Sequence, residues 1–198
     1  MAIISIGITG GIGSGKTHVC ERFEARGFRI YHADARARAL MNSDPELVEG
    51  VTRLFGKEAY LPDGTLNRPL ISSVVFKDRD RLQALNALVH PATGRDFIRW
   101  SEEAREGYGK PFLLKEAAIL YESGSHLLNQ AVITVYAPKH LRLSRVAGRD
   151  GLSEAAALAR MDKQWPELEK LSRADFVIYN DGRHDLEVQI DEAIRFFS

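Results

Sequence analysis

The sequence predicts an α/β fold with a five-stranded parallel sheet that is covered by helices on both faces. Short apolar segments rich in β-branched residues alternate with helical segments along the 198 residues, which is typical of a buried parallel sheet. A glycine-rich loop also follows the first apolar segment directly and precedes a helical one. Because ligands of such folds bind at the carboxyl ends of the strands, residues that follow strands are the candidate functional residues.

The expected strands are short, apolar and bounded by residues that end strands. Gly10 follows the first strand, Gly27 precedes the second, and Pro138 ends the fourth. The five strands are predicted over residues 3–8, 28–31, 112–114, 131–136 and 176–179.

The expected helices fill the intervals between these strands. One begins near Lys16, and another covers residues 34–41. A long helical region over residues 80–105 should break at Pro91, because proline lacks the N–H that a helix interior needs. The last helical regions cover residues 139–173 and the C-terminal segment from residue 185.

Composition narrows the class of protein further. The chain is 44% hydrophobic and carries 27 basic against 27 acidic side chains, which indicates one soluble globular domain. A net charge of zero excludes a generally basic nucleic-acid binder, and no segment has the apolar length of a membrane span. The single cysteine, Cys20, excludes a disulfide scaffold and fits a reducing compartment, so we expect a cytoplasmic protein.

The loop after the first strand matches the phosphate-binding pattern G-x-x-x-x-G-K-[ST], with Gly10, Gly15, Lys16 and Thr17 at its defined positions. Its glycines let backbone N–H groups surround a phosphate, and the following helix adds the positive end of its dipole. Lys16 should reach the β- and γ-phosphates, and the Thr17 hydroxyl should bind Mg²⁺. The dinucleotide pattern G-x-G-x-x-G does not match, because Lys16 stands where its third glycine would be.

Asp34 follows the second strand and has two open interpretations. At a carboxyl strand end it is placed to accept the proton of an acceptor hydroxyl, as a general base does. Aspartate also caps helices well, and a helix is expected to begin here. His32 is either a second polar contact or a surface residue.

Three arginines follow the fourth strand at helical spacing, so Arg142, Arg145 and Arg149 share one face. Small P-loop kinases use arginines of a mobile lid to cover the transferring phosphate, whereas the alternative is a solvated basic stripe. Arg149 is the strongest candidate because Gly148 and Gly151 beside it offer a hinge.

Taken in order, these and later motifs resemble the dephospho-CoA kinase family over nearly the whole chain. The resemblance implies ATP-dependent phosphorylation of the ribose 3′-hydroxyl of dephospho-CoA, with Mg²⁺ as the metal. The P-loop itself is generic among kinases, and the other motifs make the resemblance specific. The matching segments are residues 8–16, 33–34, 63–68, 85–91, 119–124 and 149–150, Arg160 with Gln164, and residues 174–180.

The resemblance also implies a domain organisation. It predicts one P-loop kinase domain with a core over about 1–40, 110–137 and 174–198, a helical substrate-binding part over 41–109 and a lid over 139–173. The expected partners of the protein are its two small-molecule substrates, ATP and dephospho-CoA, and neither a nucleic acid nor a membrane. The expected oligomeric state is a monomer or a weak homo-oligomer.

Carried onto this chain, the resemblance assigns roles to individual residues. Asp34 becomes the general base, with Lys16 and Arg149 as the other catalytic residues. The residues expected to bind ATP are Gly11, Ile12, Gly13, Ser14, Gly15, Lys16, Thr17, His18, Arg149 and Asn180. The residues expected to face dephospho-CoA are Asp34, Arg68, His90, Tyr121 and Glu122.

Two departures from the family pattern leave roles open. The family commonly has Asp-Ala-Asp where this chain has His32-Ala33-Asp34, so only the second carboxylate is kept. Glu116 follows the third strand and either orients Mg²⁺ or water or is a buried partner of an arginine. A kinase of the same architecture with another nucleoside as acceptor, and a module that uses ATP only as a switch, are the alternative functions.

Overall fold

The computed structural model describes residues 3–198, which divide into two compact units. The first unit comprises Met1–His32 and Ser101–Ser198, and the second comprises Ala33–Trp100. The sheet and the glycine-rich loop belong to the first unit, and the second unit is helical apart from its turns and one antiparallel bridge between Tyr60 and Leu66. The second unit overlaps the helical substrate-binding part expected over residues 41–109.

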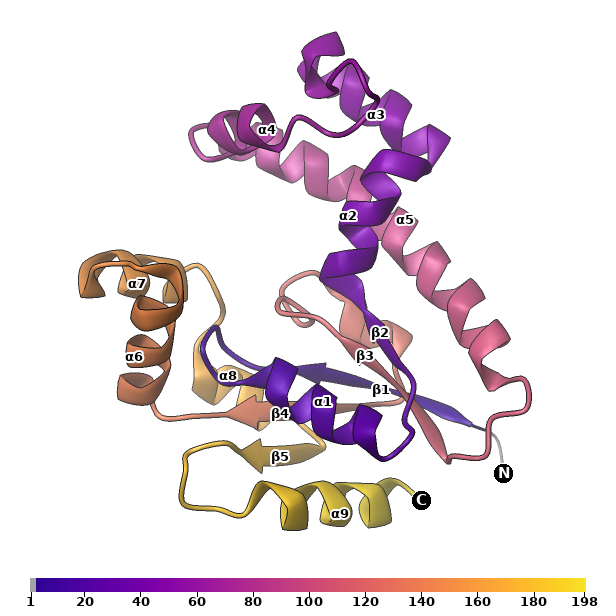
Figure 1. Ribbon diagram of the computed structural model, residues 1–198, viewed down its shortest axis with the longest axis vertical. Coiled ribbons are helices and arrows are strands. Elements are labelled where there is room, and N and C mark those ends of the chain that lie inside the picture. Colours follow the sequence, from indigo (N-terminus) through magenta and orange to yellow (C-terminus); the bar gives the residue numbers. More distant parts are fainter. Residues whose placement is uncertain (1–2) are drawn as a thin grey trace. The chain divides into compact units, whose positions relative to one another are not determined.

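The first unit is built on a five-stranded parallel sheet in the order β2-β3-β1-β4-β5 (Figure 1), as predicted. β1 lies at its centre between β3 and β4, so the loop that follows β1 emerges from the middle of the sheet. The strands are β1 (Ile4–Thr9), β2 (Ile30–His32), β3 (Phe112–Glu116), β4 (Ala131–Tyr136) and β5 (Phe176–Tyr179).

Alternating side chains of β1 bury one face of the sheet. Ile6 and Ile8 are fully buried and share a core with Phe23 of α1 and Ile190 of α9, so these two helices cover this face. On the other face Val132 is buried and α8 contacts β4. The helices of the first unit are α1 (Lys16–Ala25), α6 (Lys139–Asp150), α7 (Glu154–Met161), α8 (Glu167–Ser172) and α9 (Leu186–Phe197), with the short η2 (Ser125–Leu128).

The second unit packs its helices around a core of its own. Its buried residues include Leu47 and Val51 of α3, Ile71 of α4, and Leu85 and Val89 of α5. Its elements are α2 (Ala33–Ser43), α3 (Pro45–Phe55), η1 (Lys57–Ala59), α4 (Arg68–Val75) and α5 (Arg79–Arg105), the last of which continues into the first unit.

The predicted helix break at Pro91 is wrong, because α5 continues through this residue. Proline removes one N–H donor, which costs a helix interior roughly 3 kcal/mol. Leu85 and Val89 before the proline and Ala92 after it are all buried in one core cluster. Packing on both sides of Pro91 therefore outweighs the lost hydrogen bond.

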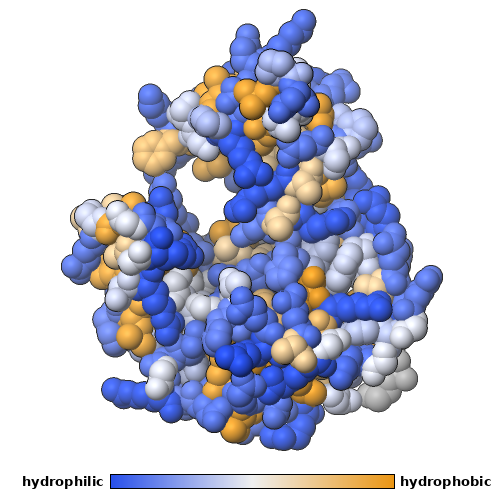
Figure 2. Space-filling view, viewed as in Figure 1, coloured by the Kyte–Doolittle hydropathy of each residue, from blue (hydrophilic) through white to orange (hydrophobic). Residues whose placement is uncertain are grey.

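No helix within residues 3–198 combines the length and apolar character that a membrane span requires. Hydrophilic side chains cover most of the face drawn in Figure 2, and the apolar side chains on it are scattered in small groups. Singly exposed apolar residues are normal on protein surfaces.

Candidate active site

The glycine-rich loop, residues 10–17 and called the P-loop below, connects β1 to α1 as the motif requires. Gly13 and Gly15 have φ angles of 81° and 89°, a region that side chains other than hydrogen disfavour. The Ser14 N–H donates to the Gly11 carbonyl across 2.9 Å, which curls the loop. The loop thus has the turned, glycine-dependent backbone that is typical of phosphate-binding loops.

The N-terminus of α1 points an unneutralised positive end at this loop. Gly15 is the N-cap residue and has no side chain to satisfy the N–H groups of the first turn, which also contains no acidic residue. Lys16 turns back over the loop, and its Nζ donates to the Gly10 carbonyl across 3.2 Å. The exposed Thr17 follows in the same turn. Backbone N–H groups, a helix dipole and an ammonium group are the features that an anion site requires.

Two residues from other elements hold the outer edge of the P-loop. Asn180, directly after β5, donates its side-chain N–H to the Ser14 carbonyl across 2.8 Å. Arg145 of α6 donates to the Gly13 carbonyl at 3.3 Å and to the Asn180 carbonyl at 3.1 Å. A Cβ atom on Gly15 would collide with the Asn180 amide, so close approach also requires glycine there.

Gln164, between α7 and α8, also binds the P-loop. Its Oε1 accepts from the Ile12 N–H across 2.6 Å, and its Nε2 donates to the Ala118 carbonyl across 2.9 Å. The sequence marked Gln164 only through the family resemblance and gave it no role. The signal that it touches the loop is purely tertiary.

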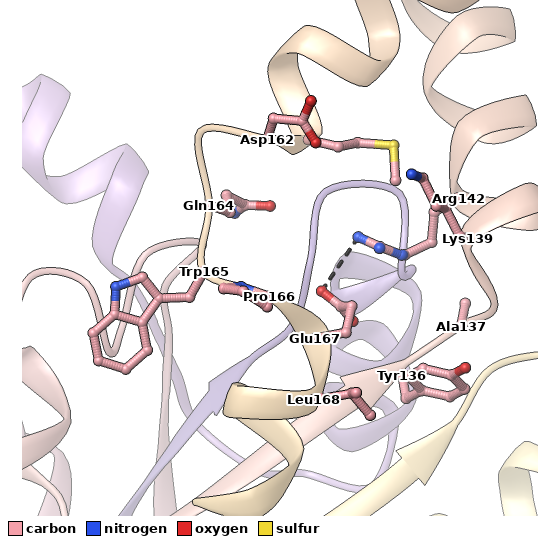
Figure 3. Close-up of a pocket in the computed structure, with 11 residues that line it drawn as sticks. Tyr136, Ala137, Lys139, Arg142, Asp162, Gln164, Trp165, Pro166, Glu167 and Leu168 are labelled. Atoms are coloured by element: carbon pink, nitrogen blue, oxygen red, sulfur yellow. Dashed lines mark ion pairs between the residues drawn. The ribbon is translucent and has the colours of Figure 1, made fainter.

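A pocket of about 540 Å³ opens beside the P-loop (Figure 3). Arg142 and Glu167 form an ion pair of 3.2 Å there, drawn in front of the loop in Figure 3. A Cβ atom on Gly11 would meet both side chains, so the pair lies directly against the loop. The lining residues are Tyr136, Ala137, Lys139, Arg142, Met161, Asp162, Gln164, Trp165, Pro166, Glu167 and Leu168.

A second ion pair continues this network into the interior of the first unit. Lys170 is fully buried, and its Nζ lies 2.8 Å from Glu122 Oε1, which also accepts from the Trp165 N–H at 3.0 Å. Burial raises the pKa of Glu167, while Arg142 and Lys170 lower it. Residues 164–170 are therefore anchored both to the P-loop and to the segment after β3.

The comparisons with known proteins agree with this geometry. The family model described as "Dephospho-CoA kinase" matches residues 4–185. The chain belongs to the dephospho-CoA kinase family. It is an α/β kinase, and the reaction of its family is ATP-dependent phosphorylation of dephospho-CoA in coenzyme A biosynthesis.

Individual relatives support the membership. The chain is 40% identical to the dephospho-CoA kinase of Chlorobaculum tepidum, over 94% of this chain and 91% of that protein. It is 38% identical to the dephospho-CoA kinase of Salinibacter ruber, over 90% of this chain and 89% of that protein. The crystal structure of TT1252 from Thermus thermophilus matches with a TM-score of 0.83 and 33% identity, covering 99% of this chain and 98% of the other. Dephospho-CoA kinase from Campylobacter jejuni matches with a TM-score of 0.71 and 29% identity, covering 98% and 96%.

Within this kinase, Arg149 lies apart from the P-loop contacts described above. It is exposed on the last turn of α6, and its guanidinium forms two hydrogen bonds with the Asp150 carboxylate, at 2.7 and 3.0 Å. Asp150 also pairs with Arg160 at 2.6 Å. Gly151 then ends the helix with a φ of 62°. Arg142 and Arg145, which were predicted to share a face with Arg149, contact the P-loop here.

Tyr121 and Glu122, expected to face dephospho-CoA, lie in the interior of the first unit. The Tyr121 ring is buried and stacks on Trp165, with 6.1 Å between ring centroids and 3° between ring planes. Glu122 is the partner of Lys170. Any contact of these two residues with the acceptor stays a prediction.

In the second unit, Asp34 lies inside the first turn of α2 rather than before it, because the helix begins at Ala33. An acidic side chain in the first turn interacts favourably with the helix dipole, so Asp34 has a stabilising place in α2, and its role as the general base stays a prediction. Arg68 is the first residue of α4, and burial lowers the pKa of His90 within α5. The contact of Arg68 and His90 with dephospho-CoA stays a prediction.

The residues with open roles have identifiable partners in the first unit. His32 lies 3.2 Å from Glu24 and 3.7 Å from Glu116, so an interacting partner of Glu116 is a histidine. His18, expected to bind ATP, is half-exposed on α1 and lies 3.6 Å from Glu21.

Proposed function

We propose that the P-loop of this kinase binds the phosphates of ATP and that Asp34 activates the 3′-hydroxyl of dephospho-CoA. The observation that supports the proposal most strongly is the P-loop itself, with left-handed glycines, an uncapped helix N-terminus and Lys16 folded over the loop. Phosphoryl transfer needs mainly positioning and charge stabilisation, which these groups supply.

Lys16 would leave the Gly10 carbonyl for the β- and γ-phosphates, where its charge offsets the charge of the triphosphate. Magnesium is the proposed metal, and when bound it neutralises charge on the transferring phosphate. The Thr17 side chain fits this ion, since it is an exposed oxygen donor in the first turn of α1, beside Lys16.

Asp34 would accept the proton of the ribose 3′-hydroxyl while the hydroxyl oxygen attacks the γ-phosphorus of ATP. The Arg149 guanidinium would leave the Asp150 carboxylate and donate to the transferring phosphate instead. Its exposed position in the last turn of α6, before Gly151, is compatible with this change of partner. The remaining proposed contacts are to the nucleotide from Gly11, Ile12, Gly13, Ser14, Gly15, His18 and Asn180, and to dephospho-CoA from Arg68, His90, Tyr121 and Glu122.

The proposed location is the cytoplasm, and the proposed state is a monomer or a weak homo-oligomer. Cys20 is a buried free thiol, which fits the reducing conditions of that compartment.

Substitution of Asp34 by asparagine tests the assignment of the base. Asparagine has nearly the same size but cannot take the proton, so kcat should fall by about 10²–10⁴. The unfolding free energy should stay within about 1 kcal/mol of wild type, since the substitution removes only the interaction of the carboxylate with the helix dipole.

Asp44 provides a matched control, because it caps α3 by accepting from the Leu47 N–H across 3.0 Å in the same unit. Asp44→Ala should cost about 1 kcal/mol of stability and leave kcat unchanged. If Asp34→Asn turns over at more than about a third of the wild-type rate, Asp34 is not the base.

A further inference from the structure

Gln164 makes the most direct side-chain contact with the curled part of the P-loop, and the phosphate chemistry described above does not use it. Its carboxamide accepts from the Ile12 N–H at 2.6 Å and donates to the Ala118 carbonyl at 2.9 Å. Both partners are backbone groups, and they come from segments far apart in the sequence. One side chain thereby joins the loop after β1 to the segment after β3.

We propose that Gln164 is a positioning residue that holds the P-loop in its phosphate-binding conformation. This inference rests on the proposed function, since it takes the P-loop as the ATP site. The Ile12 N–H is bonded to Gln164, so Ile12 contributes to binding by the direction its peptide gives to the loop. Fixing that direction before ATP arrives removes part of the ordering cost of binding.

The chemistry of the contact requires a primary amide. A carboxamide carries a donor and an acceptor on one planar group, whereas an ionised carboxylate only accepts and an ammonium or guanidinium only donates. The planar group satisfies Ile12 and Ala118 simultaneously. Loss of the amide would leave a partly buried N–H and a carbonyl without a partner.

The surroundings of Gln164 make it a rigid support. The next residue, Trp165, donates its N–H to Glu122 and stacks its ring on Tyr121. Glu167, three residues on, pairs with Arg142 against Gly11. The segment is therefore fixed directly after Gln164, and Figure 3 shows Gln164 extending from it beside the loop.

Gln130 offers a matched control in the same unit. Its Oε1 accepts from the Ser5 N–H across 2.7 Å and from the Ser5 hydroxyl across 2.9 Å. This bond is nearly as short as the 2.6 Å bond of Gln164, but it lies at the start of β1, whereas the P-loop follows the end of that strand. Gln130→Met thus removes a similar hydrogen bond at the end of β1 that is remote from the P-loop.

The experiment measures ADP binding by calorimetry without acceptor, together with urea unfolding, for wild type, Gln164→Met and Gln130→Met. Methionine keeps the length of glutamine and removes both hydrogen bonds. Gln164→Met should weaken ADP binding about tenfold, and Gln130→Met should change it by less than about twofold, with similar losses of stability. Gln164→Asn, which keeps the amide but is too short to span both partners, should weaken binding as well and serves if the methionine variant does not fold.

Equal ADP affinity in wild type and the Gln164 variants overturns the inference, as does an equal loss in Gln130→Met. Lys16→Ala separates this failure from that of the proposed function. If Lys16→Ala loses ADP binding while Gln164→Met keeps it, only the inference about Gln164 is wrong. If Lys16→Ala binds ADP like wild type, the P-loop is not the ATP site and both fail.

Discussion

Removal of Arg142 gives the most quantitative test of the packing around the P-loop. The exposed fractions of the Arg142 and Glu167 side chains are 8% and 14%, so Arg142→Met leaves a carboxylate largely buried without its nearest cation. Breaking one side of a buried pair typically costs about 3–5 kcal/mol. Lys170 also favours the charged form of Glu167, so we expect the low end, about 3 kcal/mol near neutral pH.

The loss should depend on pH in a defined direction. Burial already raises the pKa of Glu167 above 4.5, and removal of Arg142 raises it further because Arg142 lowers it in the wild type. A carboxyl group with a raised pKa binds its proton more tightly in the folded state. Its stabilising contribution is present below the unfolded pKa and disappears as pH rises through the folded pKa. The loss of unfolding free energy in Arg142→Met should therefore be smaller at about pH 5 than at about pH 8.

Urea unfolding of four proteins measures these quantities: wild type, Arg142→Met, Glu167→Met and the double variant. Replacement of both charges by apolar groups should return the unfolding free energy to within about 1 kcal/mol of wild type. A loss below about 0.5 kcal/mol in Arg142→Met, or a loss that is equal at both pH values, would refute the account of the pair.

Three further predictions concern Lys16, Arg149 and Cys20. Lys16→Ala should lower both ATP affinity and kcat, measured by calorimetry and steady-state kinetics, because the ammonium contacts phosphate before and during transfer; wild-type turnover in a folded variant would contradict this. Arg149→Ala should lower kcat more than it raises the KM for ATP, and Arg149→Lys should restore activity only in part, since lysine lacks the planar set of donors; an effect on KM alone would place Arg149 in ground-state binding. Cys20 is 1% exposed, and burial raises the pKa of its thiol, so a thiol reagent should not label the native protein quickly. Labelling should set in over the range of urea concentrations that unfolds the protein, and rapid labelling without urea would contradict the place of Cys20 in the core.

The sequence predicted the sheet well because its strands are governed by local pattern. Strands form over residues 131–136 and 176–179 with the predicted bounds. Both segments are rich in apolar and β-branched residues and are followed closely by residues that disfavour strands, Pro138 and Asn180. The second strand is displaced to Ile30–His32, and α5 continues through Pro91. In α5 tertiary burial of side chains on both sides of the proline decided the outcome, and a sequence pattern does not report such burial.

The candidate site divides in the same way. The places of Lys16 and Thr17 at the start of α1 were predictable because the P-loop motif encodes backbone geometry within a few adjacent residues. The contacts of Gln164 with Ile12 and of Glu167 with Arg142 join residues that lie far apart in the chain. Only the folded chain brings these partners together, so spacing alone gave no signal for them.

The central claim is transfer of the γ-phosphate of ATP to dephospho-CoA, and acceptor-dependent ADP formation measures it most directly. ADP should accumulate in proportion to added dephospho-CoA, and the acceptor should gain one phosphoryl group at its ribose 3′-oxygen. AMP and adenosine, tested in parallel, should leave ADP formation near its background. ADP formation that is unchanged by dephospho-CoA, or a faster rate with AMP or adenosine, would contradict the account.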